Sequence, residues 1–164
     1  MGKLYVLVGI PASGKSTFVN SVIVNKRKEI WVSRDIIRFN ILKDGEEYFS
    51  KEKEVFEEYV RQINYFLDMN FNVYADATHI NKKSRRKLLN SIRVKPDEIN
   101  AIYMKTPLEK ALKRNNKRAE KFKVPYQAMI DMWESFSEPT LEEGFDKIYT
   151  IEEGKPIQIK ERMF

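Results

Sequence analysis

The chain contains no cysteine among its 164 residues, which excludes a disulfide framework and any metal site built from thiolates. It also has no run of apolar residues long enough to span a membrane, so we expect no membrane partner. The first residues lead directly into a predicted strand, not into the apolar stretch of a signal peptide. Together these absences predict a protein of the reducing cytoplasm.

Acidic residues are outnumbered in this chain, with 24 Asp and Glu against 30 Lys and Arg, which gives a net charge of +6. A positive balance favours polyanionic partners. One basic cluster occupies residues 82–87 and another residues 110–123, whereas acidic residues gather at 46–58 and 138–143. The length predicts one domain, large enough for a central sheet with helices on both sides.

Residues 9–17, Gly-Ile-Pro-Ala-Ser-Gly-Lys-Ser-Thr, match the pattern G-x-x-x-x-G-K-[ST] of a phosphate-binding loop. The apolar run 4–8 predicts a buried strand before the loop, and 16–25 predict a helix whose N-terminus points at the phosphates. In such a loop Lys15 reaches the β- and γ-phosphates and the Ser16 hydroxyl binds Mg²⁺. A chance match in a chain of this size arises on the order of 1% of the time. The sequence therefore predicts a site for ATP or another nucleoside triphosphate with Mg²⁺, formed by Gly9, Pro11, Ala12, Ser13, Gly14, Lys15, Ser16 and Thr17.

Strands and helices alternate along the rest of the chain. The patterns predict strands at 29–32, 71–76 and 99–104, helices at 34–38, 50–69 and 81–93, further helices after Thr106 and Pro125, and a final hairpin of 147–152 and 156–160 around Gly154. Thr106, Pro107 and Glu109 have the spacing of a capping box, and the helix after Pro125 is expected to bury Trp133. This order predicts an α/β fold with a central, mostly parallel sheet flanked by helices, and ligands at the carboxyl ends of its strands.

Asp35 follows the second predicted strand, at the start of a short helix that Ser33 is placed to cap. Arg38 lies three residues later, so both side chains project from one face of that helix. Phosphoryl transfer to a hydroxyl needs a carboxylate that accepts the proton and cations that surround the phosphoryl oxygens. An ordinary ion pair on a helix surface has the same spacing. Because the pair lies beside a phosphate loop, we predict that Asp35 and Arg38 belong to the active site.

Asp76 ends the third predicted strand, where such an acid holds Mg²⁺ or its waters, or orients an arginine. Thr78 follows in the same loop, and Arg85 shares the inward face of the next helix, so we expect Arg85 to be paired with Asp76 or with a bound phosphate. The only histidine, His79, lies in this loop without an obvious partner, and this is weak evidence for a function. The predicted substrate-binding residues are Asp35, Arg38, Asp76, Thr78 and Arg85.

The second basic cluster allows two interpretations. Its lysines and arginines recur at helical spacing opposite an apolar face, which is typical of a solvated helix surface. However, the polar segment that follows Arg114 and Arg118 breaks at Pro125, as expected of a mobile helix–loop–helix lid that closes its arginines on the γ-phosphate. We predict a lid over about residues 113–125, with Arg118 and Arg114 as phosphate clamps.

Taken together, these elements resemble the kinase domain of polynucleotide kinases of the bacteriophage T4 type and the wider family of AAA_33-type P-loop kinases. The shared elements, which span nearly the whole chain, are the loop 9–17, Ser-Arg-Asp-x-x-Arg at 33–38, Asp-Ala-Thr at 76–78 with Arg85, Lys-Arg-Asn-Asn-Lys-Arg at 113–118, and the C-terminal pattern from Val124-Pro125 through Phe136, Glu138-Pro139-Thr140 and Glu143-Gly144-Phe145-Asp146. A D-x-D-G-T sequence is absent, so we expect one kinase domain over residues 1–164 and no phosphatase domain.

The resemblance implies transfer of the ATP γ-phosphate to the 5′-hydroxyl end of DNA or RNA, in nucleic-acid repair. It implies that Asp35 is the general base, that Arg38 contacts the acceptor phosphate and that Asp76 supports the acceptor site, for example through Arg38. It assigns the donor phosphates to Lys15 and to Arg118 of the lid. The location it implies is the cytoplasm, that of the host cell if the protein is phage-encoded.

Two other functions fit the same motifs. The first is a kinase of a small molecule such as a sugar acid, a nucleoside or a drug, which would have a closed acceptor pocket. The second is a nucleotide-dependent binding or regulatory protein in which Asp35 is structural, and which would bind ATP without turnover. The positive charge and the position of Arg38 favour the polynucleotide kinase, whereas the preference for DNA or RNA and the oligomeric state are left open.

Overall fold

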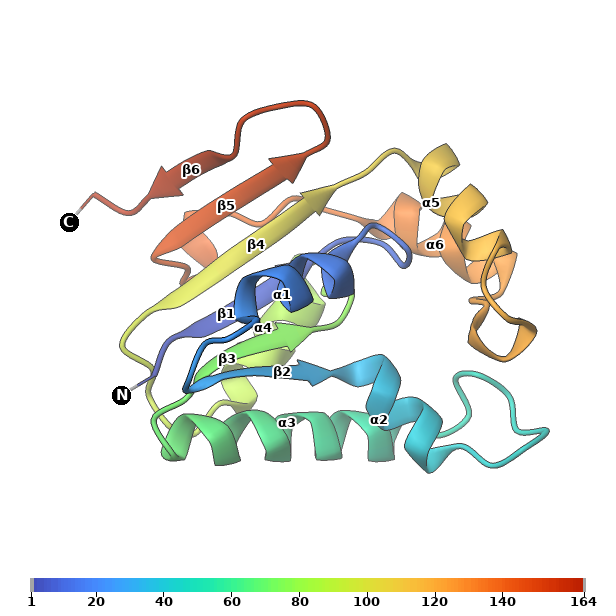
Figure 1. Ribbon diagram of the computed structural model, residues 1–164, viewed down its shortest axis with the longest axis horizontal. Coiled ribbons are helices and arrows are strands. Elements are labelled where there is room, and N and C mark those ends of the chain that lie inside the picture. The colour runs from blue at the N-terminus through green and yellow to red at the C-terminus, as the bar shows by residue number, and fades with distance from the viewer. Residues whose placement is uncertain (1, 164) are drawn as a thin grey trace.

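A six-stranded sheet in the order β2-β3-β1-β4-β5-β6 forms the centre of the computed structural model, which describes residues 2–163 (Figure 1). The first five strands are parallel, and β6 pairs antiparallel with β5 at one edge. The strands are β1 (Leu4–Val8), β2 (Glu29–Ser33), β3 (Asn72–Asp76), β4 (Ile99–Lys105), β5 (Lys147–Glu152) and β6 (Gln158–Glu161). The predicted α/β class with a mostly parallel sheet and a final hairpin is confirmed.

Helices cover both faces of the sheet and one of its ends. The helices are α1 (Lys15–Ile23), α2 (Arg34–Ile41), α3 (Glu52–Asp68), α4 (Lys82–Ser91), α5 (Leu108–Asn116) and α6 (Tyr126–Ser135), with two short 3₁₀ turns, η1 (Glu120–Phe122) and η2 (Leu141–Glu143). In Figure 1, α1 lies on one face, α3 and α4 lie on the other, and α5 and α6 lie beyond the carboxyl ends of the strands. Every helix within the described residues is too short or too polar to traverse a lipid bilayer.

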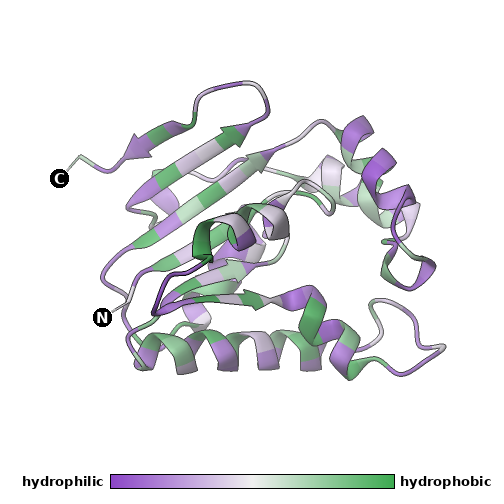
Figure 2. Ribbon diagram, viewed as in Figure 1, coloured by the Kyte–Doolittle hydropathy of each residue, from purple (hydrophilic) through white to green (hydrophobic). Residues whose placement is uncertain are grey.

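The sheet separates two apolar clusters. The larger one packs β1, β3 and β4 against α3 and α4, with Tyr59, Ile63 and Leu67 of α3 fully buried. The smaller one packs α1, through Val19, against Leu7 and Ile102. Figure 2 shows the corresponding pattern, in which apolar residues recur along the strands and α5 is largely hydrophilic. Burial on both faces explains why the central strands are nearly continuous apolar runs.

Two local expectations are wrong. The start of α5 has no side-chain cap, because the Thr106 hydroxyl donates instead to the carbonyl of Ser13 at 3.0 Å. The side chain of Trp133 is 43% exposed, whereas Met129 on the same helix is fully buried. A capping box that we did not predict occurs at Thr140 and Glu143, at the start of η2.

Candidate active site

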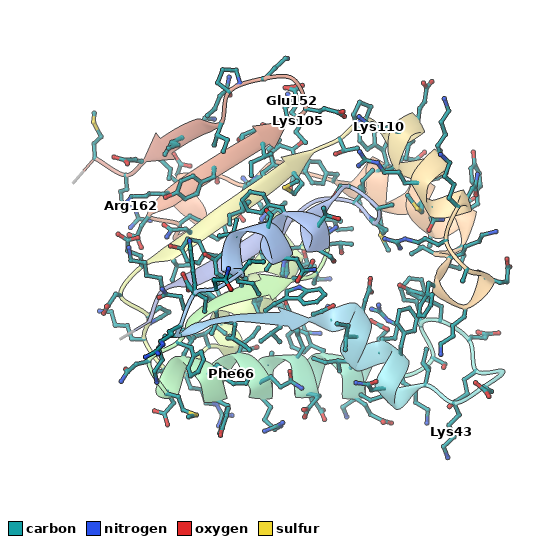
Figure 3. The ribbon with its side chains drawn as sticks, in the orientation of Figure 1. Lys43, Phe66, Lys105, Lys110, Glu152 and Arg162 are labelled. Atoms are coloured by element: carbon teal, nitrogen blue, oxygen red, sulfur yellow. The ribbon has the colours of Figure 1, made fainter. Side chains whose placement is uncertain are left out.

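A cleft of about 750 Å³ lies at the carboxyl ends of β1 to β4 and collects most of the predicted site residues. Its walls come from the phosphate loop, α2, the segment after β3, and α5. Six basic and four acidic side chains line it: Lys15, Arg34, Arg38, Lys105, Arg114 and Arg118 with Asp35, Glu52, Asp76 and Glu153. Figure 3 shows Lys105 at the end of β4 and Lys110 on α5 near this end of the molecule. An excess of positive charge suits a site for phosphates.

The phosphate loop has the backbone that its glycines require. Gly14 adopts φ +100°, a left-handed conformation that leads into α1. A Cβ on Gly9 would lie 2.7 Å from the Ser13 hydroxyl and 3.1 Å from the Met104 carbonyl oxygen, so a side chain does not fit there. The Gly9 amide donates to the carbonyl of Thr78 at 3.0 Å, which joins the loop to the segment after β3. The predicted loop-strand-helix arrangement is therefore present.

Lys15 is buried at the base of this loop. Its amine donates to the carbonyls of Gly9 and Ile10 at 2.9 and 2.8 Å. Burial lowers its pKa from the ordinary value, while Asp76 and Asp35 act in the opposite direction. An anionic phosphate would add a further opposing charge, so the amine is held in the place where the predicted role needs a cation.

Ser16 and Asp76 form the part of the cleft that fits a magnesium ion. The Ser16 hydroxyl donates to Asp76 Oδ2 at 2.8 Å, and Trp31 Nε1 donates to the same oxygen at 2.9 Å. Oδ1 of Asp76 has no hydrogen-bond partner within residues 2–163. Desolvation raises the pKa of Asp76, and the nearby Lys15 and the two hydrogen bonds oppose that shift. A hydroxyl and a carboxylate, completed by waters and substrate phosphates, are the ligands that Mg²⁺ usually takes in kinase sites.

Asp35 and Arg38 meet in the cleft as predicted, beside Tyr48. Asp35 Oδ1 accepts hydrogen bonds from Arg38 Nη1 and, at 3.2 Å, from the Tyr48 hydroxyl. Burial and the charge of Asp35 raise the pKa of Tyr48, so its hydroxyl stays protonated as a donor. Oδ2 of Asp35 has no hydrogen-bond partner among the described residues, and the Asp35 side chain is 51% exposed. One carboxylate oxygen is therefore held while the other is open to an acceptor.

Glu52 is a site residue that the sequence analysis missed. Its carboxylate accepts from Arg38 Nε at 2.6 Å and Arg38 Nη2 at 3.0 Å, a bidentate pair, and also from Arg34 Nη2 at 3.1 Å. Asp76 contacts Ser16 and Trp31, so it does not support the acceptor site through a contact with Arg38, the example that the resemblance suggested. Burial lowers the pKa of Arg38, but the hydrogen bonds that it donates to Glu52 and the charge of Asp35 outweigh this effect and raise the pKa overall. The only signal in the sequence was the acidic stretch that contains Glu52.

We expect replacement of Glu52 by glutamine to lower kcat/KM for the acceptor about 10- to 100-fold, because a charged hydrogen-bond pair contributes about 1.5–3 kcal/mol. The amide keeps the shape of the side chain but not its charge, so Arg38 turns toward Asp35 and restrains the base. Steady-state kinetics with acceptor varied at saturating ATP measure this. Glu54→Gln, an exposed position on the same helix, is the matched control. A Glu52→Gln enzyme that behaves as Glu54→Gln does would contradict the positioning role.

Arg85 lies outside this cleft. Its side chain is fully buried, and its Nε and Nη2 donate to the two carboxylate oxygens of Glu143 at 2.7 and 3.1 Å. Further bonds reach the carbonyls of His79 and Ser137 at 2.9 Å. The expected pairing with Asp76 or a phosphate is therefore wrong, and so is the placing of Arg85 among the substrate-binding residues. Its guanidinium fastens the segment after β3 to the segment after α6.

His79 is also a structural residue. It is 4% exposed, its Nδ1 bonds to the carbonyl of Leu7, and its Nε2 lies 3.2 Å from the Tyr59 hydroxyl. Burial lowers its pKa to about 3, although the bond to Leu7 opposes the shift. The histidine is therefore neutral at physiological pH, and nothing in this arrangement suits proton transfer to a substrate.

The buried neutral state of His79 predicts how stability depends on pH. Its pKa is lowered from 6.5 to about 3 on folding, so between these values the unfolded chain binds a proton that the folded chain does not. This contribution to stability is complete above pH 6.5 and is lost as the pH falls toward 3, at up to about 1.4 kcal/mol per pH unit. Urea unfolding from pH 7 to pH 4 measures it. His79→Asn tolerates the φ of +42° at this position and does not titrate, so its pH profile should be flatter; parallel profiles would contradict the assignment.

The segment predicted as a lid packs over the cleft. Arg114 Nη1 lies 3.4 Å from the Ala12 carbonyl of the phosphate loop, and Arg118 lines the cleft. The buried side chain of Asn115 bonds to both backbone groups of Val124, at 2.9 and 3.1 Å, which closes the loop between α5 and α6. Both predicted arginines therefore line the cleft that contains the phosphate loop, and their role as clamps and the closure of the segment stay predictions.

The chain's family follows from comparison with known proteins. The model of the AAA_33 family, described as an AAA domain, matches residues 4–139. The chain belongs to the AAA_33 family. This AAA_33 chain is 31% identical over 148 residues to an L-seryl-tRNA(Sec) kinase of Methanococcus maripaludis, a match that covers 87% of the chain and 56% of that kinase.

Solved structures agree with this membership. A chain of the Pnkp1/Rnl/Hen1 RNA repair complex is 27% identical to the AAA_33 chain with a TM-score of 0.66, over 79% of the chain and 42% of that protein. A gluconokinase of Sinorhizobium meliloti 1021 is 18% identical with a TM-score of 0.59, over 94% and 84%, and this likeness shows the fold alone. The chain thus spans about half the length of the tRNA kinase and of the repair protein.

The family and the relatives decide the general class of this AAA_33 chain. It has the fold of the AAA_33 P-loop kinases, with the phosphate loop of a nucleoside triphosphate site, and its own phosphotransferase activity stays a prediction. The family resemblance deduced from the sequence is confirmed. The narrower resemblance to polynucleotide kinases of the T4 type, the individual residue roles, the single-domain organisation and the cytoplasmic location stay predictions.

Proposed function

We propose that this protein is an ATP-dependent polynucleotide 5′-hydroxyl kinase, which transfers the γ-phosphate of ATP to the 5′-hydroxyl end of DNA or RNA in nucleic-acid repair. The observation that carries the proposal is the place of Asp35, whose open Oδ2 shares one cleft with the phosphate loop and with Arg34 and Arg38. A base between two arginines suits a hydroxyl that is flanked by a phosphodiester. The 27% identity to a protein of an RNA repair complex supports the same acceptor.

In the proposed reaction the acceptor hydroxyl oxygen attacks the γ-phosphorus of ATP and forms a bond to it. The bond between the γ-phosphorus and the oxygen of the leaving ADP breaks. Asp35 orients the hydroxyl and takes its proton. Lys15, Arg114 and Arg118 surround the charge that develops on the phosphoryl oxygens. Ser16 and Asp76 would hold Mg²⁺, which would neutralise part of the charge of the phosphates. Thr78 lines the same cleft, on the segment that joins Asp76 to the loop.

A second acceptor is favoured by one specific observation, the 31% identity to a kinase of seryl-tRNA. In that case the attacking hydroxyl is a serine side chain attached to the 3′ end of an RNA. The same base and donor site would serve it, because both reactions transfer a phosphoryl group to a primary alcohol next to a nucleic acid. The two functions differ in which hydroxyl carries the product phosphate.

Incubation with γ-labelled ATP and Mg²⁺ tests the proposal, with a 5′-hydroxyl DNA oligonucleotide, the same sequence as RNA, and a seryl-tRNA as acceptors. We expect label at the 5′ end of an oligonucleotide. The amounts of label on the DNA and on the RNA show which of the two is preferred. Label on the serine alone would transfer the proposal to the tRNA kinase function. Label on none of them, with ATP still bound, would reject both nucleic-acid acceptors and lead to a screen of sugar acids and nucleosides.

A further inference from the structure

Helix α4 carries an unusual distribution of charge. Lys82, Lys83, Arg86 and Lys87 are exposed on it, and its sequence contains no acidic residue. Within residues 2–163 none of these four cations takes part in an ion pair, in contrast to the buried Arg85. The four unpaired cations therefore form one face of free positive charge, here termed the α4 basic face.

This charge is placed where it lowers the stability of the helix. The N-terminal end of a helix carries a partial positive charge, so Lys82 and Lys83 in the first turn are unfavourable, by a few tenths of a kcal/mol or more each. Lys83 and Lys87 also lie four residues apart, where like charges repel. A solvated surface gains nothing from such an arrangement, whereas a surface for a polyanion does.

An aromatic ring connects the α4 basic face to the cleft. Lys87 Nζ lies 4.3 Å from the centre of the Phe56 ring of α3, and the Arg34 guanidinium carbon lies 5.4 Å from the same centre. The two cations are therefore within about 10 Å of each other, a distance that a short single strand can span. Phe56 is half-buried, and its ring is of the kind on which nucleobases stack.

Arg34, which lines the cleft, has hydrogen-bond donors that are not used within residues 2–163. Its Nη2 bonds to Glu52, but its Nη1 makes no hydrogen bond within the described residues. Arg38, by contrast, uses four hydrogen bonds on Glu52, Asp35 and Tyr48. Arg34 is therefore better placed than Arg38 to take a phosphate that enters the cleft behind the acceptor hydroxyl.

We propose that the acceptor strand leaves the cleft past Arg34, crosses Phe56 and lies along the α4 basic face through Lys83 and Lys87. The partner is a single-stranded nucleic acid several nucleotides long, because a small metabolite placed at Asp35 would not extend past Phe56 to α4. This inference rests on the proposed function and adds to it the route of the strand. It also assigns a binding role to lysines that are otherwise ordinary solvated residues.

The test compares a trinucleotide with a 20-nucleotide single strand, both with a 5′-hydroxyl. The variant is Lys83→Gln with Lys87→Gln, and the matched control is Lys26→Gln with Arg27→Gln, two exposed cations that precede the amino end of β2. Both double variants remove two positive charges from positions that make no ion pair among the described residues. Fluorescence anisotropy gives the affinity for each strand, and label transfer from ATP gives kcat/KM.

We expect the α4 variant to lose about tenfold more affinity and kcat/KM for the 20-nucleotide strand than for the trinucleotide. Its plot of log affinity against log salt should be less steep by about 1.4, since each neutralised phosphate of a single strand contributes about 0.7. Equal losses for both lengths, or losses no larger than those of the control, would overturn the route.

The two readouts separate this inference from the proposed function. If the wild-type protein transfers no label but its binding of the long strand still depends on Lys83 and Lys87, the route stands and the 5′-kinase function fails. If it transfers label to both strands without such dependence, the function stands and the route fails. Circular dichroism melting confirms that the variants are folded.

Discussion

Asp35→Asn is expected to slow phosphoryl transfer about 10²- to 10⁴-fold, the range that general-base catalysis contributes. Asparagine keeps an oxygen that can accept the hydrogen bonds from Arg38 and Tyr48, so the cleft keeps its shape. It offers no basic oxygen to the acceptor hydroxyl. Single-turnover transfer from γ-labelled ATP to the acceptor measures the chemical step directly.

The binding of ATP provides the control for this substitution. Among the described residues Asp35 makes no hydrogen bond or ion pair with the phosphate loop, so the affinity of a fluorescent ATP analogue should change less than about threefold. A loss of transfer below tenfold, or a parallel loss of ATP affinity, would contradict the role of Asp35 as base. The same variant also tests whether the protein is a binding protein without turnover, because in that case the wild type and the variant would be equally inactive.

Signals that lie within a few residues of each other allowed the fold and the donor half of the site to be predicted. The phosphate loop, the apolar strand before it and the helix after it occupy one continuous segment, and each predicts the others. Ser33 caps α2 as expected, with its hydroxyl accepting from the Ile36 amide at 3.2 Å. Because parallel strands end at the same edge, the segments after β2 and β3 had to meet the loop.

The acceptor half depends on contacts between distant residues, which a single sequence does not reveal. Glu52 lies 14 residues from Arg38, in a stretch that contains several glutamates. The sequence does not show which of them pairs with Arg38. Thr106 has the spacing of a helix cap, but its hydroxyl donates a hydrogen bond to the carbonyl of Ser13, 93 residues away. In each case a tertiary contact outcompetes the local pattern, and only the sheet order shows which partners come within reach.

The same contrast explains the error at Arg85. Its position on the inward face of α4 indicated a buried charge with a partner, which is what the structure has. The partner, Glu143, is 58 residues away in a turn that we did not predict. A buried arginine near an active site therefore does not by itself indicate contact with substrate, since here its hydrogen bonds are used to join two segments.

Arg85→Met is expected to lower the free energy of unfolding by about 3–5 kcal/mol, the effect of removing one partner of a buried ion pair. Methionine fills much of the volume but leaves the Glu143 carboxylate, 11% exposed, without its cation. The carbonyls of His79 and Ser137 lose a donor as well. Urea unfolding at pH 7 measures the loss.

Two further measurements separate this structural role from substrate binding. Burial raises the pKa of Glu143, but the bonds from Arg85 and Thr140 outweigh this and lower it, so the stabilisation from the pair is present above pH 4.5 and is lost as the pH falls below it. The stability difference between wild type and Arg85→Met should shrink accordingly at low pH. At a temperature where Arg85→Met is fully folded, its KM for the acceptor should match that of the wild type, because Arg85 lies outside the cleft. A stable variant with a raised KM would return Arg85 to the substrate-binding residues.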